Sequence, residues 1–352
     1  MRGLVLEGGG IKGSYQIGAF YALKKCGIKF DGFVGTSIGS FNAAALACGK
    51  YKELLKFWYN LDLSYVLGLN EQFIDDYNYN RRSLNTVKEA FSEVGGVLKN
   101  HGIKYEGLMN VASKIIKYDD LSKSNKDFGL VTVRLSRGVP KHKYVYKEDI
   151  RNQEQLLEYV MASCYFPGIK QRRILDDHYY IDGGFYDNSP VQMLIDKKYD
   201  EIYVLNVKGI GFYRKIKDNN AKIVHINPSR RNGMIFELDR SVIRDNIMMG
   251  YYDTLRVIKN LDGYKYCFKG KDKKYYDFIT RKIDKRLLKR VMNFFNTKSV
   301  KTAVVKAMEY VLEHEKVSYY DVYDIVRLSK KYGKRNNKHF VYRFISKIRF
   351  FF

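Results

Sequence analysis

Two strand-turn-helix units follow one another in the first 49 residues, and this repetition constrains the fold more than any other feature. Leu4–Leu6 is an apolar strand, and the glycines after it lead into Tyr15–Lys25, whose apolar residues recur at helical spacing. Phe30–Gly35 predicts a second strand, and Ile38–Cys48 predicts an alanine-rich helix after a sharp turn. Successive units of this kind predict an α/β fold, with a mainly parallel sheet at the centre of a three-layer α/β/α core.

The rest of the chain offers further strands and a long helical end. The strand candidates are Phe128–Leu135, Tyr179–Asp182, Glu201–Val207 and Lys222–Ile226. Leu54–Lys126 is mostly helical in pattern, as expected of helices that cap or flank the core. Helical periodicity dominates from about Ile235, with a basic aromatic loop or hairpin at Tyr264–Tyr276 and one or two helices at Leu287–Glu315.

Positive charge is concentrated in the second half of the chain. The formal net charge is +25, and Lys plus Arg number 28 against 23 acidic residues in 1–200 but 35 against 15 in 201–352. No acidic side chain follows Asp324. A field of this sign favours anionic partners, which are acidic lipid surfaces or nucleic acid.

Several patterns that would indicate another class of protein are absent from the sequence. The four cysteines form no C-x-x-C pair, which favours a reducing compartment. Met1–Leu6 already reads as a core strand, so we expect no signal peptide, and no apolar run is long enough to span a bilayer. We therefore expect a cytoplasmic protein, with peripheral contact at the inner membrane face as a further expectation. No ligand spacing points to a metal, and we expect no cofactor.

Gly35-Thr36-Ser37-Ile38-Gly39 fits the G-x-S-x-G nucleophile elbow, and it lies between a predicted strand and a predicted helix as that motif requires. Glycines on both sides allow the strained turn that presents a serine hydroxyl, and the helix directs its positive end at the site. The alternative is that Ser37 simply caps the helix.

Residues Gly8, Gly9, Gly10, Lys12 and Gly13 form a glycine-rich turn between the first strand and the first helix. Backbone N–H groups converge in such a turn and could hold an oxyanion or a phosphate. The phosphate-loop spacing is absent, which argues against nucleotide binding, and a purely structural turn is the remaining alternative. Lys12 either orients this loop, meets a phosphate or is solvated.

A serine nucleophile needs a base, and the six histidines lie in no recognisable motif. His178 is the nearest to a candidate, although an exposed turn is the simpler interpretation of its neighbours. Asp182-Gly183-Gly184 directly follows a strand, where a carboxylate can be held over the strand ends. Asp182 could serve as base alone, and the alternative is an ordinary turn.

Together these motifs resemble the patatin-like phospholipase family, which has a glycine-rich oxyanion loop, a G-x-S-x-G elbow and a D-G-[AG] motif in this order. Further agreement comes from Ala162-Ser163 with Pro167, from Asn188-Ser189-Pro190, from Ile226–Ser229 and from Gly250–Asp253. The resemblance covers about residues 1–260. It implies a Ser37–Asp182 dyad without histidine, an oxyanion held by amides of Gly9, Gly10 and Ile38, and backbone close to the site at Gly183 and Gly184.

The resemblance further implies a lipid acyl hydrolase of the phospholipase A or lysophospholipase type, acting on phospholipid or lysophospholipid. We expect a catalytic domain over residues 1–260 and a basic, mostly helical region over 261–352. A non-catalytic lipid-binding module and an acyltransferase on the same fold are the alternatives.

The end of the chain combines apolar and basic residues at helical spacing. Its apolar members are Phe340, Phe344, Ile345, Ile348, Phe351 and Phe352, and its basic members are Lys338, Arg343, Lys347 and Arg349. One interpretation is an interfacial helix on an anionic membrane. The others are a helix packed on its own domain and a disordered tail. Nucleic-acid binding competes as a function, but we do not expect nucleic acid to be the partner.

Overall fold

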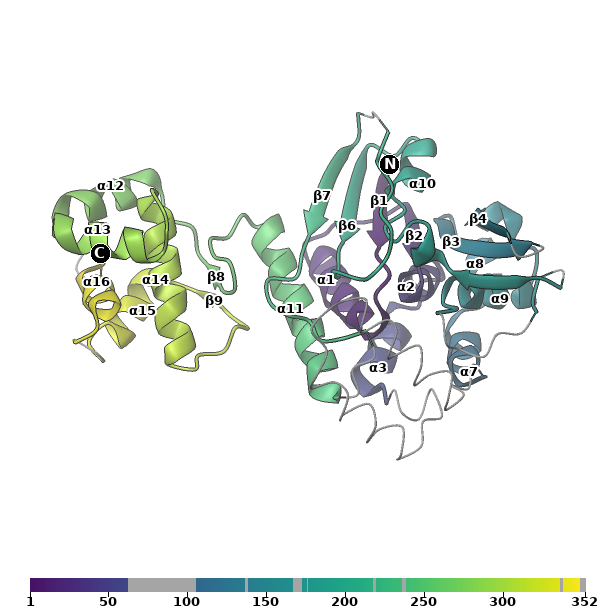
Figure 1. Cartoon of the computed structure of the whole chain (residues 1–352), viewed down its shortest axis with the longest axis horizontal. Helices are drawn as coiled ribbons and strands as arrows, with labels where there is room; N and C mark the ends of the chain where they lie inside the picture. The colour runs from purple at the N-terminus through teal and green to yellow at the C-terminus, as the bar shows by residue number, and fades with distance from the viewer. Residues whose placement is uncertain are drawn as a thin grey trace. The chain divides into compact units, whose positions relative to one another are not determined.

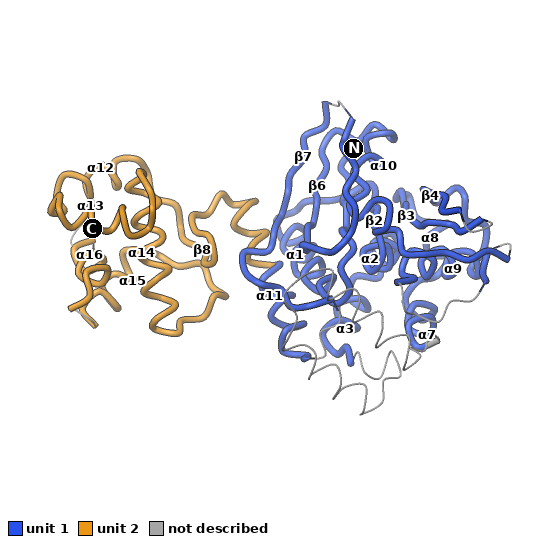
Figure 2. Tube along the Cα trace, in the orientation of Figure 1, with its two compact units in different colours: residues 1–250 blue, residues 251–352 orange. Residues whose placement is uncertain are grey.

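The computed structural model describes residues 1–62, 106–136, 139–166, 173–175, 177–217, 220–235, 239–335 and 338–348. These residues form two compact units, Met1–Gly250 and Tyr251–Phe352 (Figure 2). The division falls inside the long helix α11 (Arg240–Ile258), before residue 260 where the sequence resemblance ends. Within the described residues no helix has both the length and the hydrophobicity needed to cross a bilayer.

Unit 1 is built on one mainly parallel sheet (Figure 1). Its described strands follow the order β4-β3-β2-β1-β6-β7, with β5 also paired to β3. The parallel members are β1 (Arg2–Leu6), β2 (Gly32–Thr36), β3 (Asp127–Ser136), β6 (Glu201–Leu205) and β7 (Lys222–Ile226). The strands β4 (Val139–Tyr146) and β5 (Tyr179–Asp182) run antiparallel to β3. The predicted parallel-dominated sheet is confirmed.

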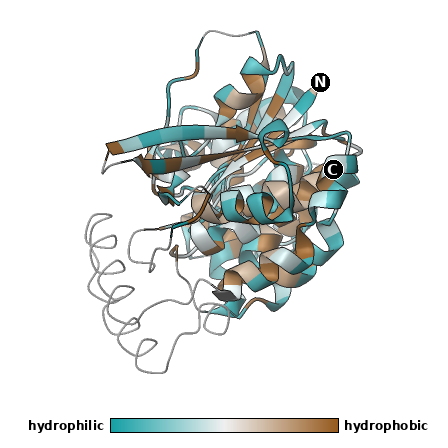
Figure 3. Cartoon of the chain, turned by 90° about the vertical axis from the view of Figure 1, so that its right-hand side faces the viewer, coloured by the Kyte–Doolittle hydropathy of each residue, from teal (hydrophilic) through white to brown (hydrophobic). Residues whose placement is uncertain are grey.

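Helices cover both faces of this sheet and complete the three-layer α/β/α arrangement. On one face, Val5, Val34 and Val131 pack with Leu194 of α10 (Val191–Asp196). On the other, α2 (Ile38–Ala47) contacts β1, β2 and β3, and α9 (Gln153–Ser163) contacts β3. The helices α1 (Gly13–Lys25) and α3 (Tyr51–Asn60) pack beside α2. Leu4, Val5 and Leu6 of β1 are fully buried. Hydrophobic residues occur on both the strands and the helices (Figure 3).

Strand β4 was not among the predicted strands. Its first four residues, Val139–His142, are exposed, so the chain shows no apolar alternation there. It pairs along β3 at one end of the sheet order, where an edge strand needs little apolar surface. In the expected capping region Leu54–Lys126, the described residues form α3, α7 (Glu106–Ile115) and α8 (Tyr118–Lys123), while 63–105 lie outside the description.

Unit 2 is a small helical domain with its own core. Its elements after α11 are β8 (Cys267–Phe268), α12 (Lys273–Lys282), α13 (Lys285–Phe294), α14 (Val300–His314), β9 (Val322–Tyr323), α15 (Ile325–Tyr332) and α16 (Phe340–Ile348). The central helix α14 contacts α12, α13, α15 and α16. The expected helical region at Leu287–Glu315 is thus two helices. The basic segment from Tyr264 contains a short strand, with an antiparallel bridge between Asp262 and Phe268, and the beginning of α12.

The interpretation of the last helix as an interfacial helix is wrong for the residues that the structure describes. Val341, Phe344, Ile345 and Ile348 of α16 are fully buried in the core of unit 2. The helix packs on its own domain, because neighbouring helices can bury an apolar stripe as well as lipid can. Phe351, Phe352 and Arg349 lie outside the described residues.

Candidate active site

Ser37 lies at a strained turn between β2 and α2. Its backbone has φ 55° and ψ −133°, a conformation that a side-chain-bearing residue rarely adopts. The turn also requires glycine, because a Cβ at Gly35 would come within 2.3 Å of the Gly39 carbonyl oxygen and one at Gly39 within 2.1 Å of the Leu6 carbonyl oxygen. This local geometry is the one that the G-x-S-x-G pattern predicts.

The structure brings Ser37 together with Asp182 at the end of β5. The Ser37 hydroxyl donates a hydrogen bond of 2.5 Å to the Asp182 Oδ2. The other carboxylate oxygen accepts from the Gly184 amide at 2.7 Å, and the Asp182 amide donates to the Tyr165 carbonyl at 2.8 Å. The carboxylate is therefore fixed against the hydroxyl by its own backbone.

Asp182 is 4% exposed, and its environment favours the protonated form more than water does. Burial raises the pKa of Asp182 from its usual 3.8 to about 6, while the hydrogen bonds from Ser37 and Gly184 act in the opposite direction. At neutral pH the group is still ionised, and it is a stronger base than an exposed aspartate. Gly183 passes close to β3, since a Cβ there would lie 2.1 Å from the Val131 carbonyl oxygen.

Ser163, at the end of α9, connects the strained turn to strand β3 by two hydrogen bonds. Its hydroxyl accepts a hydrogen bond of 2.9 Å from the Ser37 amide and donates one of 2.6 Å to the Val131 carbonyl. The side chain is fully buried. The sequence pattern singled out Ala162-Ser163 without a role for either residue, and Pro167 of the same pattern lies outside the described residues.

The glycine loop runs beside Ser37. A Cβ at Gly8 would lie 3.1 Å from the Ser37 Cβ, and one at Gly10, whose φ is +60°, would lie 2.3 Å from the Ile235 carbonyl oxygen. Gly13 begins α1, and its carbonyl accepts from the Asn42 side chain at 3.1 Å. In the described part of the chain no hydrogen bond is recorded for the Gly9, Gly10 or Ile38 amides.

Lys12 lies in the same loop, and its side chain contacts the protein backbone. Its Nζ donates to the Lys208 carbonyl at 3.0 Å. Burial lowers the pKa of Lys12 below its usual value, with the neighbouring cations Arg231 and Lys208 acting in the same direction and Glu7 against them. This contact is the one expected of a lysine that orients the loop.

A buried carboxylate at Glu7, which the sequence analysis did not identify, holds a second segment against the loop. Glu7 is 1% exposed, and its oxygens accept from the amides of Val207 at 2.5 Å and Gly209 at 3.0 Å and from the Tyr213 hydroxyl. Burial raises the pKa of Glu7, and these hydrogen bonds oppose the rise. The available signal was a lone acid between an apolar strand and a glycine run.

Asn188 joins this clamp to the loop. Its side-chain amide donates to the Gly8 carbonyl at 3.1 Å, and its own carbonyl accepts from the Gly8 amide at 3.1 Å. A Cβ at Gly209 would lie 1.8 Å from the Gly8 carbonyl oxygen. We name Glu7, Asn188, Val207, Gly209 and Tyr213 the loop clamp, because all five contact one another or the glycine loop.

No described histidine is hydrogen-bonded to Ser37 or Asp182. His178 is half-exposed and exchanges backbone hydrogen bonds with Ile174, as an ordinary turn residue does. His142 stacks on Tyr186 with ring centroids 3.9 Å apart. Across the described ranges, no group of three His, Cys, Asp or Glu side chains is placed to hold a metal ion.

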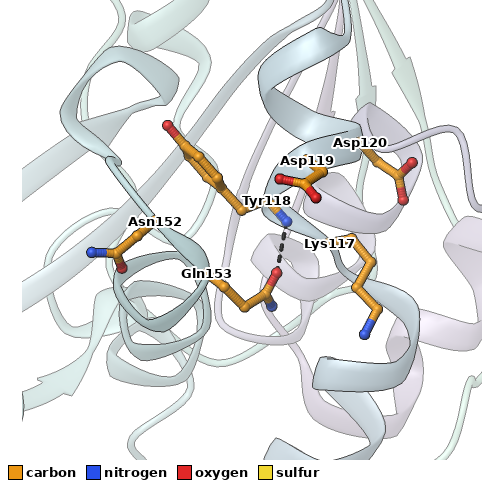
Figure 4. Close-up of a pocket in the computed structure, with 6 residues that line it drawn as sticks. All are labelled: Lys117, Tyr118, Asp119, Asp120, Asn152 and Gln153. Atoms are coloured by element: carbon orange, nitrogen blue, oxygen red, sulfur yellow. Dashed lines mark hydrogen bonds between the residues drawn. The ribbon is translucent and has the colours of Figure 1, made fainter.

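A pocket of about 530 Å³ lies beside α8 and α9 and shares no lining residue with the site around Ser37 (Figure 4). Its lining is Lys117, Tyr118, Asp119, Asp120, Asn152 and Gln153. The Gln153 side chain accepts from the Tyr118 amide at 2.7 Å and donates to the Ile116 carbonyl at 3.0 Å. These polar groups serve the packing of the two helices, and none belongs to a motif singled out in the sequence.

Comparison with known proteins gives two relatives that share the name lysophospholipase NTE1. Lysophospholipase NTE1 of Cryptococcus neoformans var. neoformans serotype D is 28% identical over 209 residues, which are 59% of this chain and 11% of that protein. Lysophospholipase NTE1 of Phaeosphaeria nodorum is 27% identical over 244 residues, or 64% and 14%. The chain therefore spans only a small part of the length of these curated relatives.

Two solved structures align with the whole chain at low similarity. VipD from Legionella pneumophila has a TM-score of 0.42 and 13% identity, covering 99% of this chain and 84% of that one. The type III effector protein ExoU has a TM-score of 0.36 and 14% identity, covering 98% and 73%.

A sequence model described as patatin-like phospholipase matches residues 4–195. This match is more than half of the chain and contains the glycine loop, the elbow and the Asp182 strand. The chain belongs to the patatin-like phospholipase family.

Proposed function

We propose that this chain hydrolyses acyl esters of phospholipids or lysophospholipids, with Ser37 as nucleophile and Asp182 as its base. The observation that carries the proposal is the 2.5 Å hydrogen bond from the Ser37 hydroxyl to the Asp182 carboxylate. The family and the relatives named lysophospholipase supply the substrate class. Residues 1–260 are the proposed catalytic domain.

In the first half of the reaction, Asp182 takes the Ser37 proton as the hydroxyl oxygen attacks the ester carbonyl. The tetrahedral oxyanion is stabilised by the Gly9, Gly10 and Ile38 amides, and collapse expels the alcohol, which takes the proton. In the second half, water gives a proton to Asp182 and attacks the acyl-serine, releasing the fatty acid and restoring the hydroxyl. Removal of one oxyanion donor typically costs about 10²–10³ in turnover, so the loop matters nearly as much as the nucleophile.

The charge of the chain supports peripheral action at an anionic membrane, because phospholipid substrates reside in bilayers and the formal net charge is +25.

Two alternative functions remain to be tested. An acyltransferase would use the same Ser37 intermediate with an acceptor other than water. A lipid-binding module would retain the fold without turnover.

The test is fatty-acid release from phosphatidylserine-containing vesicles and from lysophospholipid by the native chain, Ser37→Ala and Asp182→Asn. We expect release by the native chain and its loss in both variants, with thermal unfolding as the check on folding. Undiminished release in either variant would exclude the dyad. Acyl transfer to an added alcohol in place of fatty-acid release would favour the acyltransferase, and binding without either product would favour the lipid-binding module.

A further inference from the structure

The outer side of α13 is a continuous cationic stripe. Lys285, Arg286, Lys289 and Arg290 follow one another at helical spacing and are all exposed. The opposite side of the helix carries Leu288 and Val291, which are buried in the core of unit 2. The burial of this apolar side thus uses none of the four charges.

Acidic side chains do little to neutralise this stripe. Helix α13 contains none, and Asp284 before it accepts a hydrogen bond of 2.8 Å from the Leu287 amide as the helix cap. The ion pairs found among the described residues of unit 2 lie elsewhere, at Arg256–Asp253, Lys265–Glu313, Lys271–Asp324, Lys301–Asp262 and Arg335–Glu315. Among the described residues, no ion pair to the four cations of α13 is recorded.

An aromatic pair lies at the end of the stripe and joins it to α16. Phe294 is 52% exposed, and its ring meets the Phe340 ring edge to face with centroids 5.2 Å apart. The Arg290 guanidinium lies over the Phe340 ring at 4.3 Å. Arg343 and Lys347, one and two turns after Phe340 on α16, are also exposed.

These residues define the α13–α16 face, which is Lys285, Arg286, Lys289, Arg290, Phe294, Phe340, Arg343 and Lys347. We infer that this face docks unit 2 on an anionic lipid bilayer, with the cations at the lipid headgroups and Phe294 in the interfacial layer. The inference rests on the proposed function in one respect, which is that the substrate resides in a bilayer.

The same charges would attract a nucleic acid, but the aromatic groups fit that partner less well. Single-strand binding uses several free ring faces on which successive bases stack. On this face Phe294 is the exposed ring, and one side of Phe340 is already covered by Arg290. A cationic helix side with one exposed phenylalanine instead offers charges for lipid headgroups and one apolar group for the interfacial layer.

The test is equilibrium binding to phosphatidylcholine vesicles with and without phosphatidylserine, using the full chain with Ser37→Ala so that the lipid is not consumed. The variant carries Lys285→Gln, Arg286→Gln and Lys289→Gln, and leaves Arg290 on its ring. Each cation near such a surface contributes roughly a fivefold factor, so we expect roughly 100-fold weaker binding to the anionic vesicles. Phe294→Ala should weaken binding by about tenfold even at high salt, because its contribution is apolar.

The matched control removes the same charge at Lys259, Lys269 and Lys316, all exposed. They lie around β8, at the other end of unit 2 from α13 and α16 (Figure 1). We expect this control to stay within roughly fivefold of the parent. An equal loss in the two triple variants would mean that diffuse charge, not this face, attracts the membrane.

Three other outcomes would overturn the inference. The first is that the parent binds no vesicles, and the second is that it binds pure phosphatidylcholine vesicles as tightly as those with phosphatidylserine. The third is that the parent binds a single-stranded oligonucleotide but no vesicles, and that the α13 variant no longer binds the oligonucleotide. Turnover of a short-chain ester in solution, measured with Ser37 intact, should be unchanged by the α13 substitutions. If the native chain hydrolyses no ester, the proposed function fails while the vesicle result still decides the docking face.

Discussion

The hydroxyl of Ser163 accepts a hydrogen bond of 2.9 Å from the amide of Ser37 and donates one of 2.6 Å to the Val131 carbonyl. Ser163 thereby ties the elbow to strand β3, whose residue Thr132 is paired with Asp182. Ser37 and Asp182, the proposed nucleophile and base, are positioned through the same strand. The Ser37 amide is occupied by this bond, so the proposed oxyanion site would use other amides.

The first prediction concerns this tie. Ser163→Ala should leave the partly buried Ser37 amide without its acceptor and reduce the free energy of unfolding by about 1–3 kcal/mol. We expect kcat to fall roughly 10–100-fold with little change in KM, because the hydroxyl acts on the geometry of the turn. Ser329→Ala, another fully buried serine whose hydroxyl donates to a backbone carbonyl, is the control. An unchanged kcat would show that the elbow holds without Ser163, whereas a Ser163→Thr variant that recovers activity would support the tie.

The second prediction concerns the loop clamp. Glu7→Gln keeps the shape of the side chain but turns one acceptor oxygen into an NH₂ group facing backbone N–H donors. We expect a loss of about 1–3 kcal/mol in unfolding free energy and at least tenfold in kcat, since the 207–209 segment rests on the Gly8 carbonyl. Glu201→Gln, which affects an ion pair with Arg2 at the start of β6, should leave kcat unchanged. Equal kcat in the two variants would exclude a role for the clamp in catalysis.

Ser163 and Glu7 show which parts of the site could not be predicted from the sequence. The strand-helix units and the elbow were predictable because glycine spacing and apolar periodicity are local signals. The partners of Glu7 at Val207, Gly209 and Tyr213 are about two hundred residues away, so no local pattern could assign its role. The sequence left the covering of the apolar side of α16 undecided for a different reason: helical periodicity shows that a stripe must be covered but not what covers it.

The third prediction separates the two functional roles considered for Lys12. If it orients the loop through the Lys208 carbonyl, Lys12→Met should lower kcat by about tenfold both for a phospholipid and for an uncharged ester without phosphate. If it instead bound the headgroup phosphate, the loss would be confined to the phospholipid and would fall mainly on KM. Paired steady-state kinetics on the two substrates distinguishes these outcomes, and the observed hydrogen bond leads us to expect the first.

The fourth prediction is a pH profile. Asp182 must be ionised to take the Ser37 proton, and burial raises its pKa to about 6. We therefore expect kcat/KM on a short-chain ester to fall as the pH is lowered through about 6, with the slope of a single protonation. A short-chain ester avoids any pH dependence of vesicle binding. A limb centred near 4 would mean that the carboxylate is solvated during catalysis, or that it is not the base.

The fifth prediction is a stability effect of the same group. Its pKa is higher in the folded chain, at about 6, than the usual 3.8, so between these values the folded state binds more protons than the unfolded one. The contribution of Asp182 to the free energy of unfolding is therefore present at low pH and is lost as the pH rises to about 6, by about 3 kcal/mol in all.

Glu7 and Asp187 are buried acids whose pKa is also raised, so the native chain alone would not isolate this contribution. The difference in unfolding free energy between the native chain and Asp182→Asn does isolate it, because the variant keeps the other two acids. Denaturant unfolding of both proteins from pH 4 to pH 7 should show the native chain losing stability relative to the variant across this window. A difference independent of pH would mean that the carboxylate is not desolvated, and the raised basicity assigned to it in catalysis would then have no physical cause.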